Sequence, residues 1–385
     1  MGKPEDDLQL EKQADYRSYT LTGAHYEMGQ QGGMIARGEE AHGLTPAEVA
    51  ETAQLLGLSL DIFTTLDVTP EAGKDEEPAL SPSQLSFAEE CLQVVCNFHP
   101  PLLDELEGWC QALGVSTDSA LGMLSFSKEE SPRSCSAFAC RTEDGVVVGR
   151  NHDFFYWVRA RHLIQAKPDI YYATVGMNDG LLGGRHEGVN QKGLFVASNR
   201  AMARPPTKVR PGIIFHLVPR ILLETCATAG EAAMLAQEMP HLMSYCYLIA
   251  DPQKMLVVEA HPDVVRVREA EDGYIAVTNH YLHPDLQALM ESSVQENSEL
   301  RFRSILKSLE EANRDDAFWG SAQAILRDHE TPLCGHTDGL ATLWSMVANL
   351  TERRVAYSLG APCRNDFTKV SWPGKAHNLP SEEDS

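Results

Sequence analysis

The residue pattern of this chain changes near residue 134, and this change limits the folds that it can adopt. Upstream, Pro101 opens one helical segment and Gly114 follows it; these residue types favour helix starts and helix ends. Downstream, short apolar runs alternate with turn signals such as Asp144-Gly145. Mainly helical residues 40–126 followed by many short strands predict an α+β fold.

The expected strands and helices are interleaved along the chain. Strands are expected at residues 19–22, 136–141, 146–154, 170–175, 194–197, 245–250, 255–259, 264–269, 274–278, 341–348 and 354–359. Helices are expected at residues 25–37, 45–56, 84–98, 101–114, 116–126, 211–225, 229–238, 298–312 and 318–325. The pattern indicates strands packed with two sets of helices rather than a regular βαβ alternation.

Composition and charge exclude several classes of protein. Hydrophobic residues make up 43% of the 385 residues, which is typical of a folded protein. The net charge is −23, and nucleic acids and anionic membranes are bound through basic surfaces, so we expect neither as a partner. Residues 1–134 carry a net charge of −17 and residues 135–385 a net charge of −6, so the acidic surplus lies in the first third of the chain.

The cysteines and histidines predict reduced thiols and no metal site. The nine cysteines are scattered, and the first ten residues lack the apolar core of a signal peptide. We therefore expect a cytoplasmic location. There is no CxxC pair and no HExxH motif, so we expect neither a metal nor a cofactor. No apolar run reaches the roughly 18 residues that cross a membrane.

The main candidate catalytic residues lie in one predicted hairpin, and the register of its two strands depends on the position of the turn. A two-residue turn at residues 144–145 places Cys135 opposite Phe154. A turn centred on residues 143–144 places Cys135 opposite His152. The sequence alone leaves both registers open.

In either register Cys135 has the surroundings of an activated thiol. Asp153 lies within one position of it, and Arg150 lies on the same strand as Asp153. A guanidinium stabilises a thiolate, and a carboxylate can hold a base. If the bond between Ser134 and Cys135 is cut, the freed α-amine, with a pKa of about 7.7–8.0, can accept the thiol proton. The polar loop at residues 128–134 is a segment in which such a cut is tolerated.

Six short motifs follow one another along the chain. They are residues 23–32 (G-x-x-x-E-x-G-x-Q), 149–154 (G-R-N-x-D-F), 190–194 (N-x-x-G-L), 278–280 (T-N-H), 298–301 (S-x-x-R) and 360–363 (G-x-P-C). In the order of these motifs the chain resembles, over residues 19–368, one family of N-terminal-nucleophile (Ntn) hydrolases: the acyl-coenzyme A:isopenicillin N acyltransferases and their choloylglycine hydrolase and penicillin V acylase relatives. The resemblance implies an α+β fold in the form of a four-layer αββα sandwich, with two antiparallel sheets between helix layers.

The resemblance also implies how the reaction is divided among side chains. Cys135 would cleave the chain after Ser134 and then serve as the catalytic nucleophile. The freed α-amine of Cys135 would be the general base, and Asp153 would hold it. Asn279 would donate its side-chain amide to the oxyanion.

Four further side chains are expected around the nucleophile. Arg150 and Arg301 would stabilise charge and position the nucleophile or the substrate. Asn151 and His280 would support the site, with His280 making a hydrogen bond rather than acting as the base.

These expectations describe a self-processing cysteine amidohydrolase or acyltransferase. Its substrates would be small molecules with a linear non-peptide amide bond or an acyl thioester. Residues 1–134 and 135–385 would form one intertwined domain and remain together as a heterodimer after the cut, with further oligomers left open.

Two other functions remain possible at this point. One is a papain-like cysteine protease that uses Cys135 and His280, which are 145 residues apart. However, Cys135 precedes a strand instead of opening a helix. The other is a binding protein that keeps the fold without cutting itself.

Overall fold

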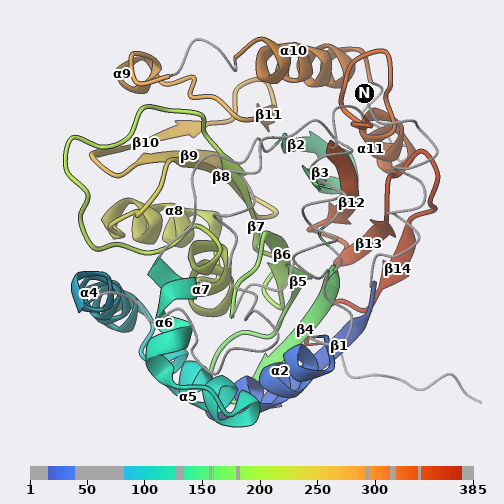
Figure 1. Ribbon diagram of the computed structural model, residues 1–385. Coiled ribbons are helices and arrows are strands. Elements are labelled where there is room, and N and C mark those ends of the chain that lie inside the picture. The colour runs from blue at the N-terminus through green and yellow to red at the C-terminus, as the bar shows by residue number, and fades with distance from the viewer. Residues whose placement is uncertain are drawn as a thin grey trace, which may run out of the picture.

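Two stacked β-sheets form the centre of the protein (Figure 1). The computed structural model describes residues 16–39, 82–125, 134–155, 158, 160–178, 183–290, 295–312, 318–336 and 340–374. The eight-stranded sheet has the order β1 (Ser18–Gly23), β4 (His162–Pro168), β5 (Thr174–Asn178), β6 (Glu187–Asn190), β7 (Phe195–Arg200), β8 (Tyr245–Ala250), β9 (Met255–His261) and β10 (Val264–Glu269). The six-stranded sheet has the order β11 (Tyr274–Val277), β2 (Ser136–Thr142), β3 (Gly145–Phe155), β12 (Leu340–Asn349), β13 (Arg354–Leu359) and β14 (Thr368–Val370).

Helices cover the outer faces of both sheets (Figure 1). The side of the eight-stranded sheet carries α2 (His25–Glu39), α4 (Pro82–Phe98), α5 (Pro101–Leu113), α6 (Thr117–Ser125), α7 (Leu217–Thr225) and α8 (Ala229–Glu238). The side of the six-stranded sheet carries α10 (Gln295–Glu311) and α11 (Phe318–Leu326), and the short α9 (Pro284–Gln287) follows β11. The protein is therefore the αββα sandwich that the family resemblance implies.

The strands of both sheets are mostly antiparallel, with one exception at an edge. β1 pairs in parallel with β4, and the other strand pairs are antiparallel. Because β1 comes from the first residues that the structure describes, this pairing attaches the upstream part of the chain directly to the sheet.

Strand alternation divides the six-stranded sheet into an inner and an outer face. In β2, Ala137 and Ala139 belong to the core between the sheets, whereas Phe138 and Cys140 pack against the outer helices. β3 alternates in the same way, with Val148 inside and Val147 outside. This period of two decides on which side of the sheet each candidate site residue points.

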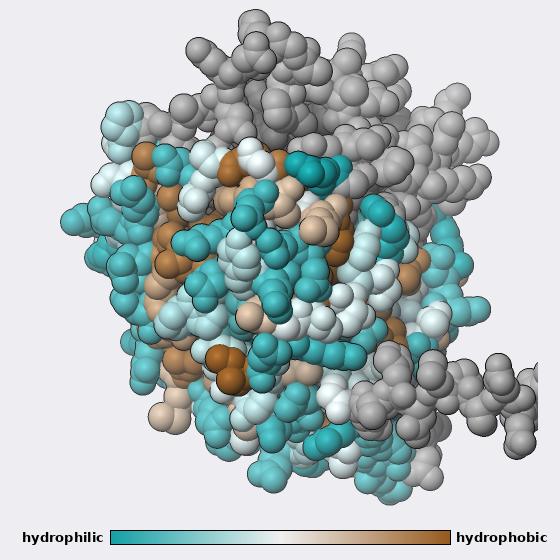
Figure 2. All heavy atoms as spheres, turned by 90° about the horizontal axis from the view of Figure 1, so that it is seen from below, coloured by the Kyte–Doolittle hydropathy of each residue, from teal (hydrophilic) through white to brown (hydrophobic). Residues whose placement is uncertain are grey.

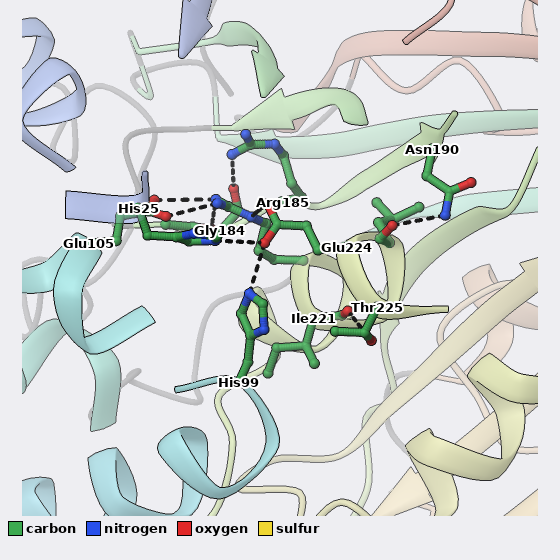
Figure 3. A network of polar contacts seen from close by, with 12 residues as sticks. His25, His99, Glu105, Gly184, Arg185, Asn190, Ile221, Glu224 and Thr225 are labelled. Atoms are coloured by element: carbon green, nitrogen blue, oxygen red, sulfur yellow. Dashed lines mark hydrogen bonds and ion pairs between the residues drawn. The ribbon is translucent and has the colours of Figure 1, made fainter. Parts of the chain in front are cut away.

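A buried ionic network also connects the upstream helices to the rest of the protein (Figure 3). The Nε2 atoms of His25 and His99 lie 3.0 and 2.8 Å from Glu224 Oε2. Arg220 Nε donates to Glu224 Oε1 at 2.5 Å, and Arg220 Nη2 donates to Glu105 Oε2 at 2.8 Å. Burial opposes ionisation of Glu224, but Arg220 and the two histidines outweigh it and lower the pKa of this carboxyl. Breaking such a buried pair leaves an uncompensated charge, so the network stabilises the contact between α2, α5 and α7.

Most of the expected elements are confirmed, and a few differ from the expectation in their bounds. The strand expected at residues 170–175 is wrong, because β5 begins at Thr174 and Ile170 is 84% exposed. The helix expected from residue 211 begins at Leu217, since Gly212 packs closely against the backbone of Pro240. The helix expected at residues 45–56 lies outside the described residues.

Three strands were not expected from the sequence: β4, β6 and β14. The clearest case is β6, whose four residues Glu-Gly-Val-Asn have weak strand propensity. It forms because β5 and β7 pair with it on both sides.

The face seen from below α2 and α5 is mostly hydrophilic, with small groups of hydrophobic side chains (Figure 2). Met34 of α2 is a hydrophobic residue that is exposed, with 65% of its surface accessible. Among the described helices, none combines the length and the apolar character needed to cross a bilayer.

Candidate functional site

Cys135 lies directly before β2, and the hairpin takes the second of the two expected registers. Thr142 pairs with Gly145 and Ser136 pairs with Asn151, so the turn is centred on residues 143–144. Cys135 therefore faces His152. Gly145 has φ +116°, a conformation that glycine favours, which explains why the glycine follows the turn centre instead of occupying it.

The Cys135 thiol is buried between the sheets and contacts two side chains of β3. Its Sγ lies 3.6 Å from His152 Nδ1, and Arg150 Nη2 donates to it at 3.8 Å. Arg150 Nη2 also lies 3.2 Å from His152 Nδ1. A guanidinium can only donate, so Nδ1 of His152 is the acceptor and carries no proton. An imidazole nitrogen that acts as an acceptor therefore lies 3.6 Å from the thiol.

Arg150 is held in place by a fully buried network. Its Nε forms an ion pair with Glu187 Oε2 at 2.9 Å, and its Nη1 donates to Asn199 Oδ1 at 2.8 Å. Trp344 Nε1 donates to the other oxygen of Glu187 at 3.0 Å, and its ring stacks on His152 with centroids 4.0 Å apart. Burial raises the pKa of the Glu187 carboxyl, and Arg150 partly offsets this rise. The network fixes both groups that touch the thiol.

The main chain of Cys135 is held from the other side by Asn279 and Arg301. The N–H of Cys135 donates to Asn279 Oδ1 at 3.0 Å. Arg301 Nη1 donates to the carbonyl of Cys135 at 2.7 Å, and its Nη2 donates to Asn279 Oδ1 at 2.8 Å. Burial lowers the pKa of Arg301, and the negative charges of Asp153 and Cys135 oppose this effect.

The side-chain amide of Asn279 is partly engaged in this structure. Its Nδ2 donates to the carbonyl of Arg200 at 2.8 Å. An amide NH₂ has two hydrogens, so the second can still donate to a reacting oxygen.

Asp153 lies opposite Ser134, but strand alternation turns its carboxyl to the outer face, away from the Cys135 thiol. Ser134 N donates to the Asp153 carbonyl at 3.5 Å. Thr342 Oγ1 donates to Asp153 Oδ1 at 2.7 Å, and Oδ2 has no hydrogen-bond partner among the described residues. Burial raises the pKa of Asp153 to about 7, although Arg301, Thr342 and Arg150 oppose the shift. The carboxyl therefore titrates near neutral pH in the uncut chain.

Asn151 also points to the outer face, where it fixes the loop after α11. Its Nδ2 donates to the carbonyls of Leu326 and Leu333 at 2.9 and 2.8 Å. Ser345 Oγ donates to Asn151 Oδ1 at 2.6 Å.

His280 contacts the residues that support Asn279. Its Nδ1 lies 2.8 Å from Ser298 Oγ and 3.1 Å from Thr278 Oγ1. Ser298 Oγ in turn accepts from the Asn279 N–H at 2.8 Å. Burial lowers the pKa of His280, which favours the neutral imidazole.

The structure thus places Arg150, Asn279 and Arg301 around Cys135, and it adds residues to which the sequence assigned no role. His152 occupies the variable position of the G-R-N-x-D-F motif, so the motif gave it no role, and only one of the two expected registers placed it opposite Cys135. Asn199 is fully buried, and its Nδ2 has no hydrogen-bond partner in the described part of the chain. The only sequence sign of Asn199 is that it follows the N-x-x-G-L motif closely.

Comparison with protein families gives a match over residues 140–364 to the family described as acyl-coenzyme A:6-aminopenicillanic acid acyl-transferase. The chain belongs to this family. The matched range begins just after Cys135 and includes β3, Asn279 and Arg301. A search of curated proteins gave no match.

Several solved structures are similar to the chain at low sequence identity. A Caenorhabditis elegans ortholog of N-acylethanolamine-hydrolyzing acid amidase is 15% identical, with 56% of this chain and 93% of that chain covered and a TM-score of 0.45. The penicillin V acylase from Agrobacterium tumefaciens is 13% identical, with 58% and 83% covered and a TM-score of 0.44. A mutant of the conjugated bile acid hydrolase from Clostridium perfringens is 13% identical, with 62% and 97% covered and a TM-score of 0.42.

Proposed function

We propose that the protein is a self-processing cysteine amidohydrolase or acyltransferase whose nucleophile is Cys135. One observation carries the proposal: the thiol touches a guanidinium and an unprotonated imidazole nitrogen, while Asn279 and Arg301 fix its main chain. A thiol used only as a small core residue needs none of these polar contacts. The family match supports the same chemistry.

The first reaction is the cut between Ser134 and Cys135. The thiol gives its proton to His152 Nδ1 and attacks the carbonyl carbon of Ser134. The C–N bond then breaks, the proton passes to the departing α-amine, and a thioester links Ser134 to Cys135. Water hydrolyses this thioester, which leaves a carboxylate on Ser134 and a free thiol on Cys135. His152 has this role because the α-amine does not exist before the cut.

The second reaction uses the new N-terminus. The α-amine of Cys135, with a pKa of about 7.7–8.0, takes the thiol proton, and the thiolate attacks the substrate carbonyl. The tetrahedral oxyanion accepts hydrogen bonds from Asn279 and Asn199, whose Oδ1 is held by Arg150. Collapse releases the amine or thiol and leaves an acyl-enzyme, which water or an acceptor amine then cleaves.

The substrates belong to the class of small-molecule amides and acyl thioesters. The description of the family names an acyl-coenzyme A, which is a thioester, and 6-aminopenicillanic acid, which is an amine. A panel of N-acyl amines, N-acyl-homoserine lactones, β-lactam amides and acyl-coenzyme A thioesters, offered with and without an acceptor amine, separates hydrolysis from transfer.

N-terminal sequencing and intact-mass measurement test the proposal. We expect a new N-terminus at Cys135 and fragments of 134 and 251 residues, and we expect Cys135→Ala to stay uncut and inactive. Cys140→Ala, a buried thiol on the outer face of β2, is the matched control and should be cut normally. An active enzyme that remains one intact chain would contradict the proposal, and an intact chain without activity would favour the binding-protein alternative.

The papain-like alternative receives less support from the geometry. It requires His280 as the base, whereas His280 Nδ1 is bonded to Ser298 and Thr278. It also requires a thiol at a helix start, whereas Cys135 precedes strand β2.

A further inference from the structure

Four potential metal ligands converge on the outer side of the six-stranded sheet. Three come from the loop after α11, and the fourth comes from the connection between β13 and β14; they are His329, Cys334, His336 and Cys363. Their ligand atoms all lie within 4.8 Å of one another. His336 Nε2 is 3.4 Å from Cys334 Sγ and 3.1 Å from Cys363 Sγ. Thus one imidazole nitrogen lies between two thiols that are 29 positions apart in the sequence.

These distances are close to those around a tetrahedral zinc ion. With Zn–S of about 2.3 Å and Zn–N of about 2.0–2.1 Å, sulfur and nitrogen ligands are about 3.5 Å apart. Two thiolates and two imidazoles are a typical structural zinc set, whereas magnesium and calcium prefer oxygen ligands. We propose a structural zinc site of the Cys₂His₂ type here, with the ligands His329, Cys334, His336 and Cys363.

One backbone hydrogen bond and one side-chain hydrogen bond hold the two halves of this proposed zinc site in position. The N–H of Cys334 donates to the Asp328 carbonyl at 3.0 Å. Arg327 Nε donates to the carbonyl of Pro362 at 2.8 Å, which ties the loop after α11 to the segment that carries Cys363. Cys334 is buried, whereas His329 is exposed, so an ion can enter from the His329 side. The ligands are therefore arranged before a metal binds.

The second cluster of histidines does not have the same properties. His25 and His99 face Glu224, but this carboxylate already pairs with Arg220 at 2.5 Å. The guanidinium supplies the positive charge that a metal would bring, and it repels a further cation. A metal is therefore expected at Cys334 and not at Glu224.

The zinc site lies next to the outer-face residues of the hairpin. Gly335 lies between the ligands Cys334 and His336. The N–H of Thr342 donates to the Gly335 carbonyl at 3.1 Å, and the N–H of Gly335 donates to Thr342 Oγ1 at 3.0 Å. Thr342 Oγ1 is the group that donates to Asp153. A methyl group on Gly335 would lie 3.6 Å from Asp153 Oδ2, so the loop packs closely against this carboxyl. Zinc would thus fix the loop that contacts Asp153.

Metal content and cobalt spectroscopy test the zinc site directly. We expect one zinc per chain in protein purified from zinc-supplemented cells. After removal of the metal with a chelator, Co²⁺ should give the absorption of a tetrahedral site with sulfur-to-metal charge transfer. Cys363→Ser should abolish the bound zinc, and His329→Gln, at an exposed ligand, should weaken Co²⁺ affinity at least ~10-fold without disturbing the fold. Cys96→Ser, a half-buried thiol on α4, should keep both the zinc and the spectrum.

Three results would overturn the zinc site. The first is a folded wild-type protein with no stoichiometric metal and no charge-transfer band on addition of Co²⁺. The second is a Cys334–Cys363 disulfide in protein purified under reducing conditions, which would identify the pair as a redox couple. The third is equal loss of metal in Cys96→Ser and Cys363→Ser. None of these readouts depends on cleavage or catalysis, so they are independent of the proposed function.

Discussion

The carboxyl of Asp153 should make the uncut chain less stable as the pH rises. Burial raises its pKa from 3.8 to about 7, so the folded chain keeps a proton that the unfolded chain loses above pH 4. The native state then binds more protons than the unfolded state between these values, and stability falls with increasing pH. Asp153→Asn removes this effect and keeps an oxygen that can accept from Thr342.

The raised pKa of Asp153 sets the size of this pH dependence of stability. Raising the pKa of Asp153 from 3.8 to about 7 corresponds to about 4 kcal/mol, of which about 2–3 kcal/mol falls between pH 5 and pH 8. We expect the stability of Asp153→Asn, relative to the parent, to increase by this amount from pH 5 to pH 8.

Urea unfolding in the uncut Cys135→Ala background measures this difference. Both proteins are then single chains with the same histidines, so the other titrating groups cancel in the comparison. A gap between the two unfolding free energies that stays the same at pH 5 and pH 8 would show that Asp153 ionises as an ordinary surface carboxyl. That result would refute the assignment of a buried, neutral acid beside the cleavage site.

Three further substitutions test other parts of the structure. His152→Gln keeps a hydrogen-bond acceptor but no base, so self-cleavage should slow ~10²–10⁴-fold in an intact-mass time course, and an unchanged rate would exclude His152 as the proton acceptor. Asn199→Ala should lower kcat of the processed enzyme ~10²–10³-fold; a change in KM alone would instead indicate substrate binding. Glu224→Gln should destabilise the uncut Cys135→Ala chain by ~3–5 kcal/mol in urea unfolding, because it removes the buried negative charge between Arg220 and the two histidines and leaves Glu105 as the one carboxylate that pairs with Arg220 among the described residues. The control Glu299→Gln, in an exposed pair with Arg303, should lower the free energy of unfolding by less than ~1 kcal/mol. An equal decrease in the two variants would show that the buried network does not stabilise the protein.

Local sequence signals were sufficient for much of the fold. The presence of a hairpin between β2 and β3, though not its register, and helix α8, with its capping box at Thr228 and Glu231, are determined by residues close together in the chain. The strands that were missed depend on distant partners: β6 is short and polar, and it forms because Arg150 and Trp344 satisfy Glu187 while β5 and β7 pair with its backbone. The residues near β6 in the sequence do not predict these contacts.

In the candidate site, too, some features follow from the sequence and others from the tertiary structure alone. By itself, the sequence determined that Cys135 directly precedes a strand, that Arg150 and Asp153 return beside it, and that the motifs follow the order of an acyltransferase family. The tertiary structure decided that the Asp153 carboxyl faces away from the thiol and that His152 touches it. It also decided that two cysteines and two histidines without any recognisable spacing meet in one cluster. The physical reason is that strand and turn preferences act over a few residues, whereas these contacts depend on the register and packing of sheets whose strands are far apart in the chain.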